Sequence, residues 1–378
     1  MKVIGSDIGT MNIITSSMME DNKMQFKSMR NMFLPISTDT LETNELTDSQ
    51  LDYVIQQDED GDDKVYILGE DAFRFSQIFG SEIRRPMSKG VISSGEIDAI
   101  DVLTVMLEKL VGKVEVGKAI YSIPSQSVDL RTPPVLYHEK VFNKIFKTLG
   151  YESKGINEAL SIIYSNCRNS NFTGIAISFG AGLTNVCCAY KGQPTISFAV
   201  SRGGDWIDDN VSSSTGTVSS RVTSIKERDL DLINPSVGKK KEKRVREALT
   251  FYYEDLIEYV LDVFENQFNQ NADGLSIDED MPIIVSGGTS RPSNFVELFR
   301  KVFDDKKEFP YDISEIRHAD DPLNAVAKGC LIYGLWENSK SWHRQIFDLI
   351  RFFADVKKEK VWLVHKHYLK DIYFQTKQ

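Results

Sequence analysis

Two short segments of this chain could bind phosphate through their backbones. Residues 3–15, VIGSDIGTMNIIT, place a tight turn between two apolar runs, and residues 174–189, GIAISFGAGLTNVCCA, repeat that plan. A tight turn presents backbone N–H groups on its concave side, and glycine allows phosphate oxygens to approach closely. A third glycine turn follows in IIVSGGTS, residues 283–290. A single glycine turn usually only reverses a strand, but the duplication favours a nucleotide held between two similar half-domains.

Two acidic residues could act on such a phosphate chain. Asp7 stands where the first apolar run enters its turn, so its carboxylate could hold a magnesium ion through water. A local hydrogen bond within the turn would explain the same residue. Asn157 and Glu158 stand at the start of a predicted helix, where Asn is a good cap and an acidic residue suits the helix dipole. Capping alone would account for Glu158.

Composition limits the classes of function. The chain has 378 residues, 41% of them hydrophobic and 26% charged, which is typical of a globular protein of two or three domains. Its net charge of −10 disfavours direct binding to nucleic acid or to an anionic membrane. Four cysteines lack metal-ligand spacing, so we expect buried thiols in a reducing compartment. The N-terminus enters a strand directly, and no run of about 18 apolar residues occurs, which predicts a cytoplasmic protein.

Strands and helices alternate along the chain. The apolar spacing predicts a helix over residues 96–111 with one face formed by Ile97, Ile100, Leu103, Leu107 and Leu110. Residues 137–149 predict another helix, and KAIYSIPS between them predicts a buried strand. A basic run, KKKEKRVRE, precedes a long helix to about residue 269 with an apolar stripe of Val245, Leu249, Tyr252, Leu256, Val260 and Val263. This order predicts α/β halves with mixed sheets, whose loops face a shared cleft.

Two segments have no assigned chemistry. The acidic stretch over residues 38–63 lacks a calcium-loop spacing and predicts a solvated loop or a small exposed subdomain. Residues 335–378 are rich in aromatic and basic side chains. This extension could pack on the first domain, contact a subunit or an adaptor protein, or lie on a membrane surface, and the last option is the least favoured.

The motifs together resemble the actin-like ATPase superfamily, which also contains the heat-shock chaperone ATPase domains and the sugar kinases. DIGTMN is similar to its first phosphate motif, SFGAGLTN to the second and VSGGTSRP to the adenosine motif, while GINEALSIIYS and DPLNAVAKGCLIYG are similar to its two connecting helices. IRRPMSKGVISSGEIDAI and SRGGDWID further resemble the bacterial actins of the MreB group. The resemblance covers about residues 1–334.

This resemblance implies a set of site residues. Asp7 would face magnesium, Gly9, Thr10 and Asn12 the phosphates, and Glu158 would orient and partly deprotonate the water that attacks the γ-phosphate. The segment around residues 215–232 has no clear adenine-binding match; Arg221, Lys226 and Glu227 are candidates, and surface ion pairs explain them equally well. The predicted nucleotide contacts are Asp7, Gly9, Thr10, Met11, Asn12, Ser178, Gly180, Ala181, Gly182, Thr184, Gly203, Gly204, Asp205, Lys226, Gly287, Gly288 and Thr289.

One residue departs from the family pattern. The second phosphate motif of the family usually begins with Asp, and here Ser178 stands in that place. Serine can hydrogen-bond a phosphate but supplies no negative charge, so we expect weaker metal binding and slow hydrolysis unless Asp205 or another acid substitutes.

The resemblance implies an actin-like fold of two duplicated RNase H-like domains around a nucleotide cleft. We expect domain I over residues 1–152 plus 331–378, with a small subdomain at about 31–80, and domain II over 153–330, with a helical subdomain at about 205–275. The expected function is an ATP- and ADP-binding protein with Mg²⁺ that forms head-to-tail filaments and hydrolyses ATP slowly. A chaperone-like or regulatory nucleotide switch that does not polymerise is the alternative, and a small-molecule kinase is a weaker one.

Overall fold

The computed structural model describes residues 1–36, 51–57, 63–79, 81–129, 135–235, 240–270, 277, 279–306 and 308–339. Residues 1–333 form one compact unit, and residues 334–378 are a separate one. The expected C-terminal extension lies outside the described residues from 340 onward, as does most of the acidic stretch at 38–63. No helix in the described ranges combines the length and the apolarity needed to cross a bilayer.

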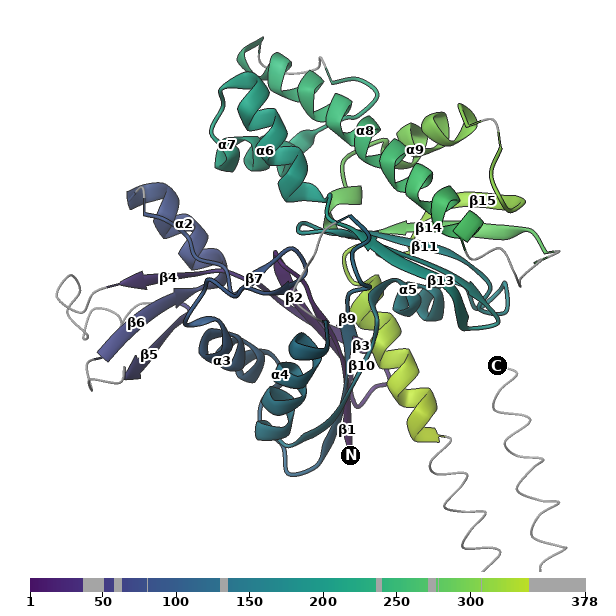
Figure 1. Cartoon of the computed structure of the whole chain (residues 1–378). Coiled ribbons are helices and arrows are strands. Elements are labelled where there is room, and N and C mark those ends of the chain that lie inside the picture. The colour runs from purple at the N-terminus through teal and green to yellow at the C-terminus, as the bar shows by residue number, and fades with distance from the viewer. Residues whose placement is uncertain are drawn as a thin grey trace, which may run out of the picture. The chain divides into compact units, whose positions relative to one another are not determined.

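The first half of the chain forms a five-stranded sheet, which we call sheet I (Figure 1). Its strand order is β10-β9-β1-β2-β3, in which β1 is antiparallel to β2 and parallel to β9. The strands are β1 (Lys2–Ile8), β2 (Asn12–Met18), β3 (Met24–Arg30), β9 (Gly117–Ile123) and β10 (Tyr151–Asn157). Helices α3 (Ala99–Val111) and α4 (Val135–Thr148) contribute to the apolar core of this half.

The second half repeats this topology in sheet II (Figure 1). Its strand order is β13-β12-β11-β14-β15, in which β11 is antiparallel to β12 and parallel to β14. The strands are β11 (Gly174–Phe179), β12 (Thr184–Tyr190), β13 (Gln193–Val200), β14 (Met281–Ser286) and β15 (Ile313–His318). Each sheet therefore has an antiparallel three-strand meander followed by two parallel strands, which is the duplication that the sequence predicts.

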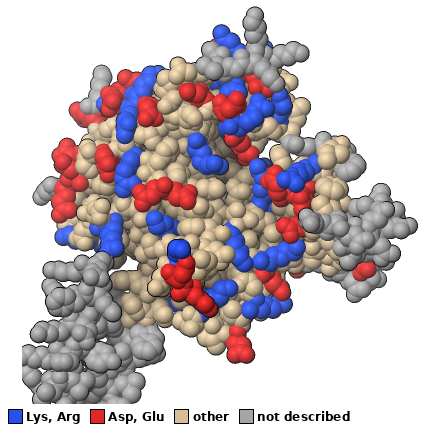
Figure 2. Space-filling model, turned by 180° about the vertical axis from the view of Figure 1, so that it is seen from behind, with Lys and Arg blue, Asp and Glu red and all other residues tan. Residues whose placement is uncertain are grey.

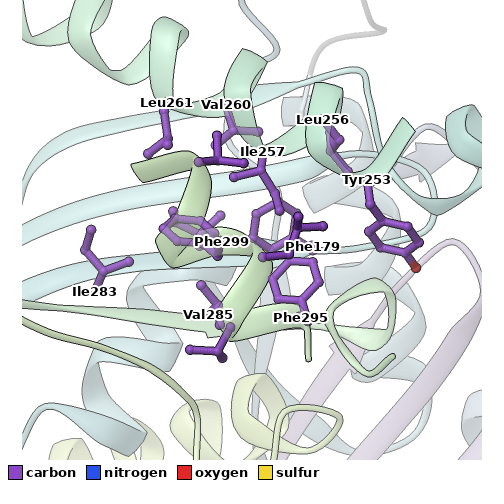
Figure 3. Close-up of a cluster of buried hydrophobic side chains, with 14 of the residues drawn as sticks. Phe179, Tyr253, Leu256, Ile257, Val260, Leu261, Ile283, Val285, Phe295 and Phe299 are labelled. Carbon is purple, nitrogen blue, oxygen red and sulfur yellow. The ribbon is translucent and has the colours of Figure 1, made fainter. Parts of the chain in front are cut away.

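Helices cover sheet II on both faces. On one side lie α6 (Gly204–Thr215), α7 (Ser219–Asp229), α8 (Lys240–Gln270) and α9 (Phe295–Asp304), whose apolar side chains form one core with the strands. Figure 3 shows part of this core, where Phe179, Phe295 and Phe299 pack beneath α8. On the other side, α5 (Glu158–Asn166) packs on β11 and β12. A further cluster joins Ile120 of sheet I, α5 and Ile284 of sheet II, so buried apolar contacts connect the two halves.

The remaining elements form small additions. A three-stranded sheet, β4-β6-β5, consists of β4 (Phe33–Ile36), β5 (Tyr53–Gln57) and β6 (Asp63–Leu68), followed by α2 (Gly69–Phe79). β7 (Met87–Ser88) and β8 (Val91–Ile92) form a short hairpin, η2 (Gly288–Ser290) is a 3₁₀ turn, and the last helix of the described residues begins at residue 325. On the face shown in Figure 2, basic and acidic side chains are interspersed.

The helix predicted over residues 96–111 is wrong in its start and in part of its apolar face. The expected helix over residues 96–111 begins only at Ala99, and Ile97, which was placed on its apolar face, is 94% exposed. Ile100 is also exposed, because the buried face is formed by Val102, Leu103 and Met106 together with the next turns. In α8 the predicted Tyr252 is partly buried and packs against the core, and the buried face also includes Tyr253, which is fully buried. The four cysteines are free and buried, as expected.

Candidate functional site

Two tight turns, one from each sheet, meet at the centre of the site. Turn 1 (residues 8–12) joins β1 to β2, and the Gly9 N–H donates to the Asn12 carbonyl at 2.9 Å. Turn 2 (residues 179–184) joins β11 to β12, and the Gly180 N–H donates to the Leu183 carbonyl at 3.1 Å. An equivalent backbone hydrogen bond closes each turn, because the two hairpins have the same turn geometry.

The turns lie against each other. A Cβ on Gly182 would collide with the Thr10 hydroxyl and would lie 2.9 Å from the backbone nitrogen of Gly90. The Thr10 hydroxyl in turn accepts a hydrogen bond from that Gly90 nitrogen at 2.9 Å. Only glycine at position 182 permits this approach, so the two predicted phosphate loops face one another.

Two partly buried acids lie beneath the turns. Ser122 donates to Asp7 Oδ1 at 3.0 Å, and the Asn185 amide donates to Glu158 Oε2 at 2.9 Å. Burial, together with the nearby Glu158 charge, raises the pKa of Asp7 to about 8. Burial also raises the pKa of Glu158, while hydrogen bonds from Ser178 and Asn185 oppose that shift. The acid pair would therefore favour a bound cation, which stabilises both carboxylates in their charged form.

The Asn157 cap fixes the direction of Glu158. The Asn157 side chain accepts a hydrogen bond from the Leu160 N–H at 2.9 Å, so α5 begins at Glu158. The other side of the Asn157 amide donates to the Ser125 hydroxyl at 2.7 Å. Asn157 therefore caps the helix, and the Glu158 carboxylate faces Asn185 and Ser178.

The third glycine loop, residues 287–289, contacts turn 2. Gly287 has φ of +92°, and a Cβ there would collide with the Phe179 carbonyl. The Thr289 hydroxyl donates to the Gly180 carbonyl at 2.9 Å. Gly288, by contrast, faces open space, with no atom within 4 Å of a Cβ built on it. The loop is therefore anchored at Gly287 and Thr289 and open at Gly288.

A cavity of about 460 Å³ lies among these loops. This volume is within the range of roughly 300–1,000 Å³ that is usual for small-molecule sites. The predicted residues that line it are Asp7, Gly9, Thr10, Met11, Asn12, Glu158, Ser178, Gly180, Ala181, Gly182, Asp205, Lys226, Gly287, Gly288 and Thr289. Residues that are far apart in the sequence thus surround one space.

Three predicted contacts do not line this cavity. The Thr184 side chain is buried and donates to the Arg202 carbonyl at 2.8 Å. Gly203 and Gly204 lie behind turn 2, where the Gly204 N–H donates to the Gly180 carbonyl at 2.9 Å. Their observed positions support the backbone of turn 2, and contact with a nucleotide remains a prediction for them.

The candidates for the adenine pocket have protein partners. Lys226 Nζ lies 2.8 Å from Asp208 and 2.9 Å from the Gly204 carbonyl, both on α6. Glu227 pairs with Arg30 of β3 at 2.9 Å, and both side chains line the cavity. Arg221 pairs with Glu242 at 2.7 Å and is not among the lining residues.

Ion pairs join the two halves beside the cavity. Arg30 and Glu227 form one such pair, and Arg85, which precedes β7, forms another with Asp205 of α6 at 2.9 Å. The surrounding solvent limits each pair to at most about 1 kcal/mol. Asp205 is therefore already paired with Arg85. It is not an unpaired carboxylate that could replace the family's Asp at position 178.

Sequence reasoning missed several lining residues. Arg30, Leu230, Tyr253 and Ser293 also line the cavity. Tyr253 had a usable signal, because it stands four residues from both Leu249 and Ile257 on the buried stripe of α8. The sequence carries no signal for Arg30, because its position in the site depends on how β3 and α7 approach each other.

The residues present fit a nucleotide with a magnesium ion. Glycine turns line the cavity on two sides, and a Cβ built on Gly288 would meet open space. Tyr253 also lines the cavity, and its buried hydroxyl has no partner among the described residues. In the described ranges, no group of three or more His, Cys, Asp or Glu side chains could hold a metal by itself. Magnesium commonly needs only one or two carboxylates when phosphates supply further oxygens, and Asp7 fits that requirement.

Comparison with known proteins agrees with this architecture. The family model described as Volactin matches residues 1–333. The chain belongs to the Volactin family. A search of curated proteins finds no match.

Solved structures share the fold. MreB5 of Spiroplasma citri bound to AMPPNP has a TM-score of 0.61 at 14% identity, with 90% of this chain and 98% of that chain covered. The MamK double helical filament has a TM-score of 0.58 at 16% identity, with coverage of 87% and 97%. The apo psk41 ParM protein has a TM-score of 0.51 at 16% identity, with coverage of 90% and 98%. These likenesses confirm the predicted actin-like fold.

Proposed function

We propose that this protein binds ATP and ADP with Mg²⁺ between turn 1 and turn 2. The observation that carries the proposal is the contact of Gly182 with Thr10 and Gly90, which brings the two glycine turns to opposite sides of one cavity. A polyphosphate in that cavity would meet backbone N–H groups from both halves of the chain. Bound nucleotide would then set how closely the halves approach.

Each group has a distinct role in this proposal. Gly9, Thr10 and Asn12 contact the phosphates from turn 1, Gly180, Ala181 and Gly182 contact them from turn 2, and Asp7 holds the magnesium ion. The loop at Gly287–Thr289 contacts the nucleoside. Magnesium supplies positive charge that neutralises the phosphate oxygens.

We infer that hydrolysis of ATP to ADP and phosphate is slow. Glu158 orients the attacking water and accepts its proton, and the Asn185 amide fixes the carboxylate for that task. Burial raises the pKa of Glu158, which disfavours the charged form that acts as a base. Ser178 donates a hydrogen bond but adds no charge, so the site has one fewer carboxylate than the family pattern.

We further infer that the chain assembles head to tail into filaments under nucleotide control. The same fold forms a double helical filament in MamK. A head-to-tail contact is heterologous, so it propagates along a filament instead of closing as a dimer. The bound nucleotide would set the angle between the halves, and that angle would decide whether the two end surfaces fit.

Sedimentation and electron microscopy of the full chain with ATP, ADP and a nonhydrolysable analogue test this function. We expect polymer with ATP and with the analogue, and less polymer with ADP. Gly182→Val should neither bind nucleotide nor assemble, whereas Gly95→Ala is a matched control, because a Cβ at Gly95 meets no atom within 4 Å. Chains that bind ATP but stay monomeric in every state would contradict assembly and favour a regulatory switch. Absence of ATP binding would contradict the whole proposal.

A further inference from the structure

Tyr253 lies on the inner face of α8, at the end of the core that borders the cavity. Its side chain is fully buried, and its ring meets Phe295 edge to face with centroids 6.0 Å apart. Figure 3 shows the hydroxyl oxygen turned away from the labelled apolar side chains of this core. The same residue lines the cavity.

The Tyr253 hydroxyl has no hydrogen-bond partner in the part of the chain that the structure describes. A buried hydroxyl without a partner costs about 1–3 kcal/mol relative to one that is hydrogen-bonded. A phenylalanine at this position would fill the same apolar space without that cost. The hydroxyl therefore has no evident role in stabilising the ligand-free fold.

The surroundings keep this hydroxyl protonated. Burial and the nearby carboxylates of Asp208 and Glu227 raise the pKa of Tyr253 well above its ordinary value. Asp208 Oδ2 already accepts from Lys226 and Thr223, at 2.8 and 2.7 Å. Its Oδ1 is also buried without a partner, so a water-mediated link from Tyr253 to Asp208 is the competing explanation.

The position within the cavity indicates which part of a nucleotide would meet the hydroxyl. Phe295, against which the Tyr253 ring packs, begins α9 directly after the loop that holds Gly287, Gly288 and Thr289. Leu230, Pro292 and Ser293 line the same cavity and belong to adjoining segments, since the Leu232 N–H donates to the Ser293 carbonyl at 3.0 Å. This wall belongs to sheet II and its helices, on the side of the predicted nucleoside loop.

We propose that the Tyr253 hydroxyl donates a hydrogen bond to the nucleoside part of the bound nucleotide, either to an acceptor nitrogen of the base or to a ribose oxygen. The inference rests on the proposed nucleotide function and adds a binding residue from α8. Tyr253 is then a specificity residue, whose hydroxyl is satisfied only when the ligand is present.

The substitution Tyr253→Phe tests this role, because it removes one oxygen and keeps the ring. Titration calorimetry with ADP should show affinity about 2- to 10-fold weaker than for the unaltered chain, as expected for one lost hydrogen bond. Thermal unfolding without nucleotide should show an equal or higher Tm, since the unpaired hydroxyl is gone. Tyr252→Phe is the matched control: Tyr252 is the preceding residue on α8, packs on Trp206 and is not among the lining residues, so this substitution should leave ADP affinity unchanged.

A second ligand separates the two possible acceptors. If Tyr253 contacts the ribose 2′-hydroxyl, Tyr253→Phe and 2′-deoxy-ADP should each weaken binding, and together no more than either alone. If it contacts the base or another ribose oxygen, the two effects should add.

Three results would overturn the inference. Unchanged ADP affinity in Tyr253→Phe, while the unaltered chain binds ADP, would overturn it and leave the nucleotide function intact. A lower Tm without nucleotide, with unchanged affinity, would assign the hydroxyl to a structural link with Asp208. Absence of binding by the unaltered chain would overturn the nucleotide function, and this inference with it.

Discussion

Turn 1 and turn 2 have the same backbone geometry, but only turn 1 follows an acidic residue. In sheet I, Asp7 lies opposite Ile14 of β2, and in sheet II, Ser178 lies opposite Asn185 of β12 at the equivalent place. Asp7 accepts a hydrogen bond from Ser122, whereas Ser178 contacts the carboxylate of Glu158. Sheet I thus presents charge to the cavity, while sheet II presents a hydroxyl that helps to hold the proposed base. The two halves therefore share the loop geometry but differ in the side chain before the turn, which is Asp7 in sheet I and Ser178 in sheet II.

The largest effect is expected at Glu158. We expect Glu158→Gln to reduce phosphate release from ATP by at least about 100-fold, because the amide cannot accept the proton from water. ATP affinity should change little, so the assay needs a phosphate-release measurement beside a binding measurement. Phosphate release at the unaltered rate would remove Glu158 from the proposed chemistry.

The apolar core of sheet I contains a titratable group with a testable effect on stability. His138 of α4 is buried, packs edge to face on Phe142 with centroids 4.6 Å apart, and burial lowers its pKa to about 4. Between pH 6.5 and 4 the unfolded chain binds a proton that the folded chain does not, so this residue lowers the free energy of unfolding as pH falls.

We expect the histidine to cost the folded chain about 2 kcal/mol at pH 5 relative to pH 8. Denaturant unfolding of the unaltered chain and of His138→Leu at both pH values isolates this effect from that of the acidic residues. Hydrogen exchange should show that α4 loses protection at pH 5 before α8 does. An identical pH dependence in both chains would show that His138 is not neutral and buried.

The difference in charge between the turns predicts different responses to magnesium. Asp7→Asn should remove most of the magnesium dependence of ATP affinity, a change of about 10-fold or more, since one partly buried charge contact is worth over 1 kcal/mol. Ser178→Ala should change that dependence by less than about 2-fold. ATP titrations with magnesium and with EDTA give the comparison, and equal effects of both substitutions would contradict the asymmetry.

Restoring the missing acid should have the smallest effect. Ser178→Asp adds a second carboxylate beside turn 2, and we expect phosphate release to rise several-fold with magnesium present. Glu158→Gln combined with Ser178→Asp is the control, and it should remain inactive. A fall in the rate would mean that the hydrogen bond from Ser178 to Glu158 matters more than the missing charge.

The sequence predicted features that depend on local geometry. Glycine at 9, 180 and 182 and the Asn157 cap follow from what a short turn or a helix start requires, and the structure contains each of them. The start of α3 was wrong because apolar spacing also continues through Ile97, which precedes the helix and faces solvent.

The remaining features depend on tertiary approach. Lys226 carries the same charge whether it contacts a ligand or Asp208, and only the packing of α6 against α7 decides between these partners. Arg30 reaches Glu227 across 197 residues of sequence, which no local pattern encodes. Tyr253 is one residue away from the stripe predicted for α8, because the buried face of that helix is wider than the stripe and also includes Ile257 and Leu261. The division into domains and the role of the extension beyond residue 339 stay predictions.

Titration calorimetry of the full chain with ATP and magnesium tests the central claim most directly when the unaltered chain is compared with Gly9→Val and Gly182→Val. We predict one ATP per unaltered chain and a loss of affinity in both variants, because each turn contributes one side of the same phosphate site. Absence of binding, or binding that one of the two substitutions leaves intact, would contradict a nucleotide held from both sides.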